Sequence, residues 1–208
     1  MTRASRAAEP RLPYGVHDQV VYLSGVSWAD YERIDALRDE SSVPRLTYVE
    51  GVLELMSPGT PHESDKKRLA RLFEAYLEHI GVPVEGLGSW TVKDKKKKLG
   101  AEADECYVFT TEPVGPTVKA PDLVIEVVHS PGGIDKLDIW RKLGAREVWF
   151  WQDAKLDVFV LRRGVFVSAR RSALVPAMDL ELVVRCMAER TQTAAIRALR
   201  AALAKLHK

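Results

Sequence analysis

The sequence APDLVIEVV, residues 120–128, decides the fold, because it predicts a β-strand that carries two acidic residues. Residues 105–110 predict a preceding strand, and Gly115 lies in the turn between the two. If this hairpin is symmetric about Gly115, position 104 lies opposite position 126. Directly opposed side chains share a face, with Cβ atoms ~5 Å apart. We therefore expect Asp104 and Glu126 to converge on one point.

Two carboxylates that face each other repel, so such a pair implies one of three arrangements. A cation lies between them, one carboxyl is protonated, or one is exposed to water. Mg²⁺ takes one or two carboxylates together with water and phosphate oxygens, and a bound metal polarises phosphoryl oxygens and lowers the pKa of water. Phosphodiester hydrolysis needs both functions. Asp122 shares the face of Glu126 because side chains alternate along a strand, so it is a further candidate.

Lys136 lies ten residues beyond Glu126, near the start of the helix predicted for residues 135–143. Gly132-Gly133 allows a sharp turn between the two, so the lysine stem could reach back over the end of the strand. A positive group there would stabilise charge that develops at a phosphate. Spacing alone favours a plainer alternative, in which the acids are solvated and Lys136 covers a helix end.

The flanking elements predict an α/β (α+β) fold, with a mixed central sheet flanked by helices. The core order is helix, three strands, helix, strand, with a helix and hairpin before it and a C-terminal helix after it. The predicted ranges are 28–39 (helix), 46–49 and 52–56 (a hairpin about Glu50-Gly51), 62–79 (helix), 84–92, 105–110 and 120–128 (strands, with a charged connection over 93–98), 135–143 (helix), 146–151, 156–161 and 164–169 (strands) and 191–208 (helix). We expect residues 1–16 to form a flexible tail and residues 17–190 a single domain. The helix of residues 191–208 is expected to pack on this domain or on a partner.

The composition suits one soluble globular domain of 208 residues. The net charge of +2, from 31 basic and 29 acidic residues, is not that of a dedicated nucleic-acid binder, but a local basic patch would suffice. Cys106 and Cys186 lack metal-ligand spacing. We find no stretch apolar enough to span a membrane and no secretory signal, so a cytoplasmic location is expected.

Several short motifs, taken in order, carry a resemblance to a known family. They are EGVLELMSP (50–58) followed by His62, AEADECY (101–107), PDLVIEVV (121–128), GGIDKLDIW (132–140) and GAREVW (144–149). Over roughly residues 26–165 the chain resembles the large bacterial "putative restriction endonuclease" family of the PD-(D/E)XK nuclease superfamily. The resemblance implies a restriction-endonuclease-like fold and a DNA substrate. It also implies a divalent metal, Mg²⁺ (or Mn²⁺), with Asp104 and Glu126 as ligands and Lys136 as the catalytic lysine.

Two positions depart from the superfamily pattern. Val128 occupies the place of the usual lysine, two residues after the second acid, so the amine is expected from Lys136 on the following helix. Ala103 stands where a proline is common before the first acid, which removes backbone rigidity but no chemistry.

Three further residues are weaker candidates. His62 fits the family pattern at the start of a helix and could face the site. Glu102 shares a strand face with Asp104, although a solvated strand start is the simpler interpretation. Asp122 could be a ligand or the neighbour of one. Asp135 is expected to cap its helix rather than bind metal.

The sequence thus predicts metal-dependent hydrolysis of DNA phosphodiester bonds by Asp104, Glu126 and Lys136, with Asp122 assisting. The alternative is a non-catalytic nucleic-acid-binding or regulatory protein on the same scaffold, because fold does not fix function. The C-terminal helix keeps a homodimer open as a further expectation.

Overall fold

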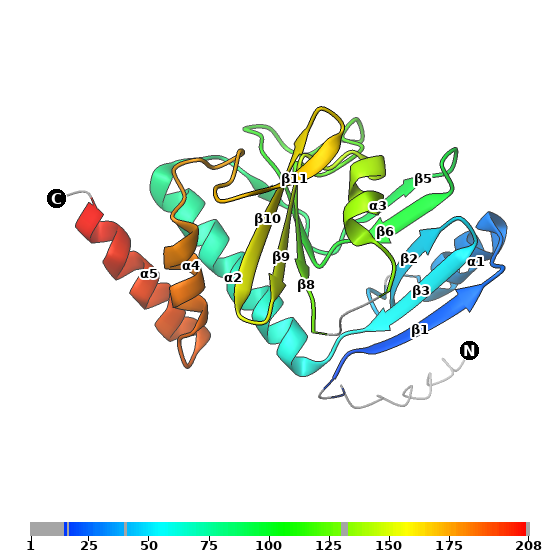
Figure 1. Ribbon diagram of the computed structural model, residues 1–208, viewed down its shortest axis with the longest axis horizontal. Coiled ribbons are helices and arrows are strands. Elements are labelled where there is room, and N and C mark those ends of the chain that lie inside the picture. The colour runs from blue at the N-terminus through cyan, green and yellow to red at the C-terminus, as the bar shows by residue number, and fades with distance from the viewer. Residues whose placement is uncertain (1–14, 16, 40, 130–132, 207–208) are drawn as a thin grey trace, which may run out of the picture.

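The chain folds into two β-sheets, and the six-stranded one is the mixed central sheet that was predicted (Figure 1). The computed structural model describes residues 15, 17–39, 41–129 and 133–206, so the predicted tail of residues 1–16 lies outside the described residues apart from Gly15. The five-stranded sheet is antiparallel throughout, in the order β1 (Gln19–Ser24), β3 (Val52–Ser57), β2 (Arg45–Val49), β6 (Leu99–Glu102) and β5 (Thr91–Asp94). The six-stranded sheet has the order β11 (Val165–Ala169), β10 (Lys155–Arg162), β9 (Glu147–Gln152), β8 (Leu123–Val127), β7 (Glu105–Val108) and β4 (Glu85–Gly86). Its only parallel pair among these strands is β8–β9, so this sheet is mixed, as expected.

The prediction of one strand over residues 84–92 is wrong. The segment divides into β4 and β5, which belong to different sheets. Gly88, between them, has a φ of +57°, a left-handed conformation that ends the first strand and redirects the chain. The first two residues of the predicted charged connection, 93 and 94, are also strand, because β5 and β6 form a hairpin whose turn covers residues 95–98.

The helices follow the predicted pattern with one addition. They are α1 (Trp28–Arg38), α2 (Thr60–Ile80), α3 (Lys136–Leu143), α4 (Leu180–Met187) and α5 (Gln192–Leu206). Asp135 caps α3 by accepting a hydrogen bond from the Asp138 backbone N–H, as expected. Helix α4 was not predicted, although Asp179 caps it in the same way and its apolar residues recur at helical spacing.

Three clusters of buried apolar side chains hold these layers together. Helices α2 and α4 pack on one face of the six-stranded sheet, and α5 packs against these two helices, in a cluster that includes Phe73, Trp149 and Leu199 (Figure 1). Helix α3 lies between the other face and the five-stranded sheet, with Trp140 fully buried. Helix α1 packs on the five-stranded sheet through Tyr31. The apolar face of α5 is therefore used inside its own domain.

The side chains of β3 alternate between the two faces of the five-stranded sheet, and this alternation directs Glu54 toward the candidate site. Leu53 is fully buried in the cluster beneath α1, so its neighbour Glu54 faces the opposite side of the sheet. That side carries α3 and faces the six-stranded sheet.

No helix among the described residues combines the length and apolar character needed to cross a bilayer.

Candidate functional site

The register of the β7–β8 hairpin is the predicted one. Glu105 pairs with Ile125 and Tyr107 with Leu123, so continuing the register by one residue places Asp104 opposite Glu126. Asp104 itself lies in a bend just before β7 rather than inside the strand. The backbone thus brings the two acids to neighbouring positions, and their side-chain contacts decide whether they share a site.

A cavity of about 270 Å³ lies between the two sheets, at the ends of β3 and β8. From the five-stranded side, and from the segment leading into it, it is lined by Asp18, Val20, Tyr22, Glu54 and Met56. From the other side it is lined by Glu126, Val127, Val128, His129, Gly133, Ile134, Lys136 and Phe150. Of the predicted site residues, Glu126 and Lys136 therefore reach the same cavity.

Glu126 is the buried acid of this cavity, with only 3% of its surface exposed. The Trp140 indole N–H donates to its Oε1 at 2.6 Å, and Lys136 Nζ donates to its Oε2 at 3.3 Å. Lys136 thus reaches back from the start of α3 to the end of β8, as the ten-residue spacing predicted. Trp140, one turn further along the helix, fixes the orientation of the same carboxylate.

Glu54 is a second acid of the cavity, which the sequence analysis did not select. Its Oε1 lies 4.0 Å from Lys136 Nζ, and its Oε2 accepts a hydrogen bond from the Tyr22 hydroxyl at 2.9 Å. Burial, followed by this contact with Glu54, raises the pKa of Tyr22 to about 12. A signal was present, because Glu54 is the one charged residue of an otherwise apolar strand.

Asp104 belongs to a neighbouring buried network. Its side chain is 1% exposed, and its Oδ2 accepts a hydrogen bond from the Val127 backbone N–H at 2.6 Å. Its Oδ1 is ion-paired with Arg45 Nη1 and lies 3.1 Å from His62 Nε2. This oxygen has no hydrogen bond of acceptable geometry from any described residue. Asp104 therefore lies beside Glu126 through the Val127 backbone, while its charge is paired with Arg45.

His62 orders this network from the first turn of α2. Its Nδ1 lies 3.0 Å from Asp18 Oδ2, and its Nε2 lies 3.1 Å from Arg45 Nη1. Burial is the largest cause that lowers the pKa of His62, to about 4, so the ring is neutral at neutral pH. A neutral ring that donates from Nδ1 to Asp18 presents Nε2 as an acceptor. His62 thus faces the Asp104 network, as its family position suggested.

The free energy of unfolding is expected to fall as the pH is lowered from 6.5 to 4. The folded protein binds a proton at His62 only near its pKa of about 4, whereas the unfolded chain binds one near 6.5. As the pH falls, the unfolded state is therefore protonated first, and the free energy of unfolding decreases. The decrease is complete below pH 4 and is on the order of 3 kcal/mol. Urea unfolding of the wild type and His62→Gln across this range measures it. The variant lacks the titrating ring and should show a shallower dependence; equal slopes would contradict the assignment.

The structure places Glu102 and Asp122 outside the cavity. Glu102 is 2% exposed, so the interpretation as a solvated strand start is wrong. Its oxygens accept hydrogen bonds from Arg38, the Thr91 hydroxyl and the Leu46 backbone N–H. Asp122 accepts from the Phe109 N–H at 2.9 Å and pairs with Arg146 at 3.0 Å, which closes the far end of the β7–β8 hairpin. Both acids are fully engaged in holding strands together.

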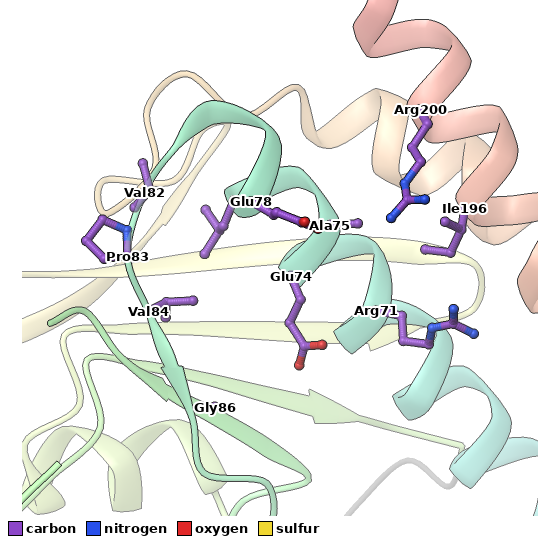
Figure 2. Close-up of a pocket in the computed structure, with 11 residues that line it drawn as sticks. Arg71, Glu74, Ala75, Glu78, Val82, Pro83, Val84, Gly86, Ile196 and Arg200 are labelled. Carbon is purple, nitrogen blue, oxygen red and sulfur yellow. The ribbon is translucent and has the colours of Figure 1, made fainter. Parts of the chain in front are cut away.

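A larger cavity, of about 520 Å³, lies between α2, α5 and the segment that includes β4 (Figure 2). Its charged lining residues are Arg71, Glu74, Glu78 and Arg200, all of them exposed, so its charges balance. None of the predicted site residues reaches it. The smaller cavity between the sheets is therefore the candidate site.

The donor atoms beside the smaller cavity suit a hard divalent cation. Glu126 lines the cavity and offers carboxylate oxygens. Asp104 is not among the lining residues, and its buried Oδ1 is ion-paired with Arg45 but accepts no hydrogen bond. Within the described ranges, no three His, Cys, Asp or Glu side chains are grouped closely enough to hold a metal unaided. A cation here would need water or phosphate oxygens as further ligands, which is how Mg²⁺ usually binds.

Comparison with known proteins places the chain in a family. Residues 28–187 match the family model Uma2, described as "Putative restriction endonuclease". A solved structure from Anabaena variabilis ATCC 29413, described as a putative nuclease belonging to DUF820, superposes with a TM-score of 0.52 at 12% sequence identity. The match covers 84% of this chain and 99% of that one, and it confirms the restriction-endonuclease-like fold. The search of curated proteins found no match. Because the family model spans most of the chain, this protein belongs to the Uma2 family of putative restriction endonucleases.

Proposed function

We propose that this protein hydrolyses DNA phosphodiester bonds with the help of Mg²⁺ or Mn²⁺. Glu126 and Asp104 would hold the cation, and Lys136 would act on the phosphate. One observation carries the proposal: the Lys136 ammonium and the Glu126 carboxylate, 3.3 Å apart, line one cavity of a protein from a nuclease family.

The side chains around the cavity supply orientation and charge. Trp140 fixes Glu126 through its indole N–H, and the Val127 backbone N–H fixes Asp104 beside it. Lys136 presents a positive charge that would stabilise negative charge developing on the phosphate. When bound, the cation would polarise a phosphoryl oxygen and lower the pKa of an attacking water.

The lysine run of residues 95–98 is partly engaged in contacts within the protein. Lys97 donates to the Lys142 carbonyl and pairs with Asp94, and Lys95 lies 3.9 Å from Glu32. These contacts neutralise part of the run, so it offers DNA less positive charge than its four lysines suggest.

The direct test is cleavage of supercoiled plasmid DNA by the purified chain. We expect nicked and linear products with Mg²⁺ or Mn²⁺, none with excess EDTA, and recovery when the metal is restored. Gel densitometry against time gives the rate. Intact plasmid at every metal concentration, or cleavage that EDTA does not affect, would contradict the proposal.

A second candidate function is nucleic-acid binding without turnover. It is supported by the ion pairs of the two acids, because Arg45 neutralises Asp104 and Lys136 neutralises Glu126. This alternative predicts salt-sensitive DNA binding without a metal requirement. Titration of Mn²⁺ into the protein by calorimetry separates the two, because only the nuclease should bind the ion.

A further inference from the structure

The Lys136 ammonium lies between two carboxylates that come from different sheets. Glu126 belongs to β8 and lies 3.3 Å from Nζ, and Glu54 belongs to β3 and lies 4.0 Å from it. The side chains are 17% exposed for Lys136, 4% for Glu126 and 9% for Glu54. With so little water present, the two attractions are weakly screened, and both act on the position of the ammonium.

Glu54 is itself held in place from two directions. The Tyr22 hydroxyl donates to its Oε2 at 2.9 Å. Gly133, whose φ is +107°, brings the loop before α3 against this pair, and a Cβ there would come within 3.2 Å of Glu54 Oε2 and would clash with the Tyr22 hydroxyl. A glycine is therefore required where the loop crosses the Tyr22–Glu54 pair.

We propose that Glu54 is a positioning residue for Lys136. It draws the ammonium toward the five-stranded sheet and limits its pairing with Glu126, which leaves the Glu126 carboxylate available to a cation. Tyr22 and Gly133 hold Glu54 at the distance that this balance needs. The inference rests on the proposed function for its catalytic consequence, but the balance of charges can be measured without DNA.

Because two acids share one ammonium, the effect of replacing Glu54 on thermal stability should depend on whether Lys136 is present. In the wild type, Glu54→Gln removes an attractive partner of the ammonium, so we expect Tm to fall by roughly 2–4 °C. In a Lys136→Met background, Glu54 and Glu126 face each other with no ammonium between them. The same Glu54→Gln change then relieves repulsion, and Tm is expected to rise. Differential scanning calorimetry of the four proteins measures both shifts.

The matched control is an exposed pair of similar separation. Glu32 and Lys95 lie 3.9 Å apart, with side chains 44% and 76% exposed. The corresponding cycle of Glu32→Gln and Lys95→Met should show no dependence of one change on the other, because exposed pairs contribute little. If Glu54→Gln lowers Tm equally with and without Lys136, the positioning role is overturned.

Cleavage tests the consequence for the reaction. In Glu54→Gln we expect a loss of roughly 10–100-fold in kcat, with little change in KM, together with a higher Mn²⁺ concentration for half-maximal cleavage. Tyr22→Phe keeps the charge of Glu54, so its kcat should fall less than that of Glu54→Gln. Unchanged kcat and Mn²⁺ dependence in Glu54→Gln would overturn the inference while the nuclease assignment stands. A wild type that cuts nothing would instead defeat the proposed function, and the thermal cycle alone would then decide whether Glu54 positions Lys136.

Discussion

Replacing Glu126 with Ala is expected to lower metal-dependent plasmid cleavage by roughly 10²–10³-fold or more. Glu126 lines the cavity and is the nearer of the two acids paired with Lys136, at 3.3 Å, so its removal takes away a proposed metal ligand and the closest partner of the ammonium. Lys136→Ala should lower the rate over a similar range, because it removes the positive charge beside the phosphate. Initial rates with saturating Mn²⁺ measure both changes.

Two further variants make this result interpretable. Glu126→Gln keeps an oxygen that accepts from the Trp140 indole, so it should fold normally and still lose activity. Glu112→Ala changes an exposed residue of the β7–β8 connection that does not line the cavity, and it should cut like the wild type. Equal cleavage by the wild type, Glu126→Gln and Lys136→Ala would remove these residues from any catalytic role.

Replacing Arg45 with Met is expected to lower the free energy of unfolding by about 3–5 kcal/mol. Arg45 and Asp104 are 4% and 1% exposed, so the substitution would leave a buried carboxylate without its main counter-charge. Urea unfolding monitored by circular dichroism measures the loss. The effect should be among the largest of any single polar substitution in the chain.

The double variant Arg45→Met/Asp104→Asn should recover much of this stability, because the orphaned charge is removed with its partner. Arg33→Met is the matched control, since Arg33 forms a salt bridge with Asp30 while 78% exposed. Arg33→Met should lower the free energy of unfolding by less than about 1 kcal/mol. Comparable losses for Arg45→Met and Arg33→Met would show that the Asp104 carboxylate is not held as a buried charge.

The sequence by itself determined the elements and the contacts that depend on nearby residues. Periodic apolar residues located α1 and α2, Asp135 was predicted to cap α3, and the turn centred on Gly115 set the β7–β8 register. The approach of Lys136 to Glu126 could also be predicted, because a short connection and one helix start join them. Such features follow from chain geometry over about ten residues, where period and spacing are informative.

Only the tertiary structure decided how the strands divide into two sheets and which acids face the cavity. Glu54 gained its role from Tyr22, 32 residues away, and Glu102 became a buried structural acid through Arg38, 64 residues away. Asp104 likewise took Arg45 and His62 as partners instead of Glu126. Charged side chains are flexible and pair with whatever the packing brings near, so their partners depend on long-range contacts that no local pattern encodes.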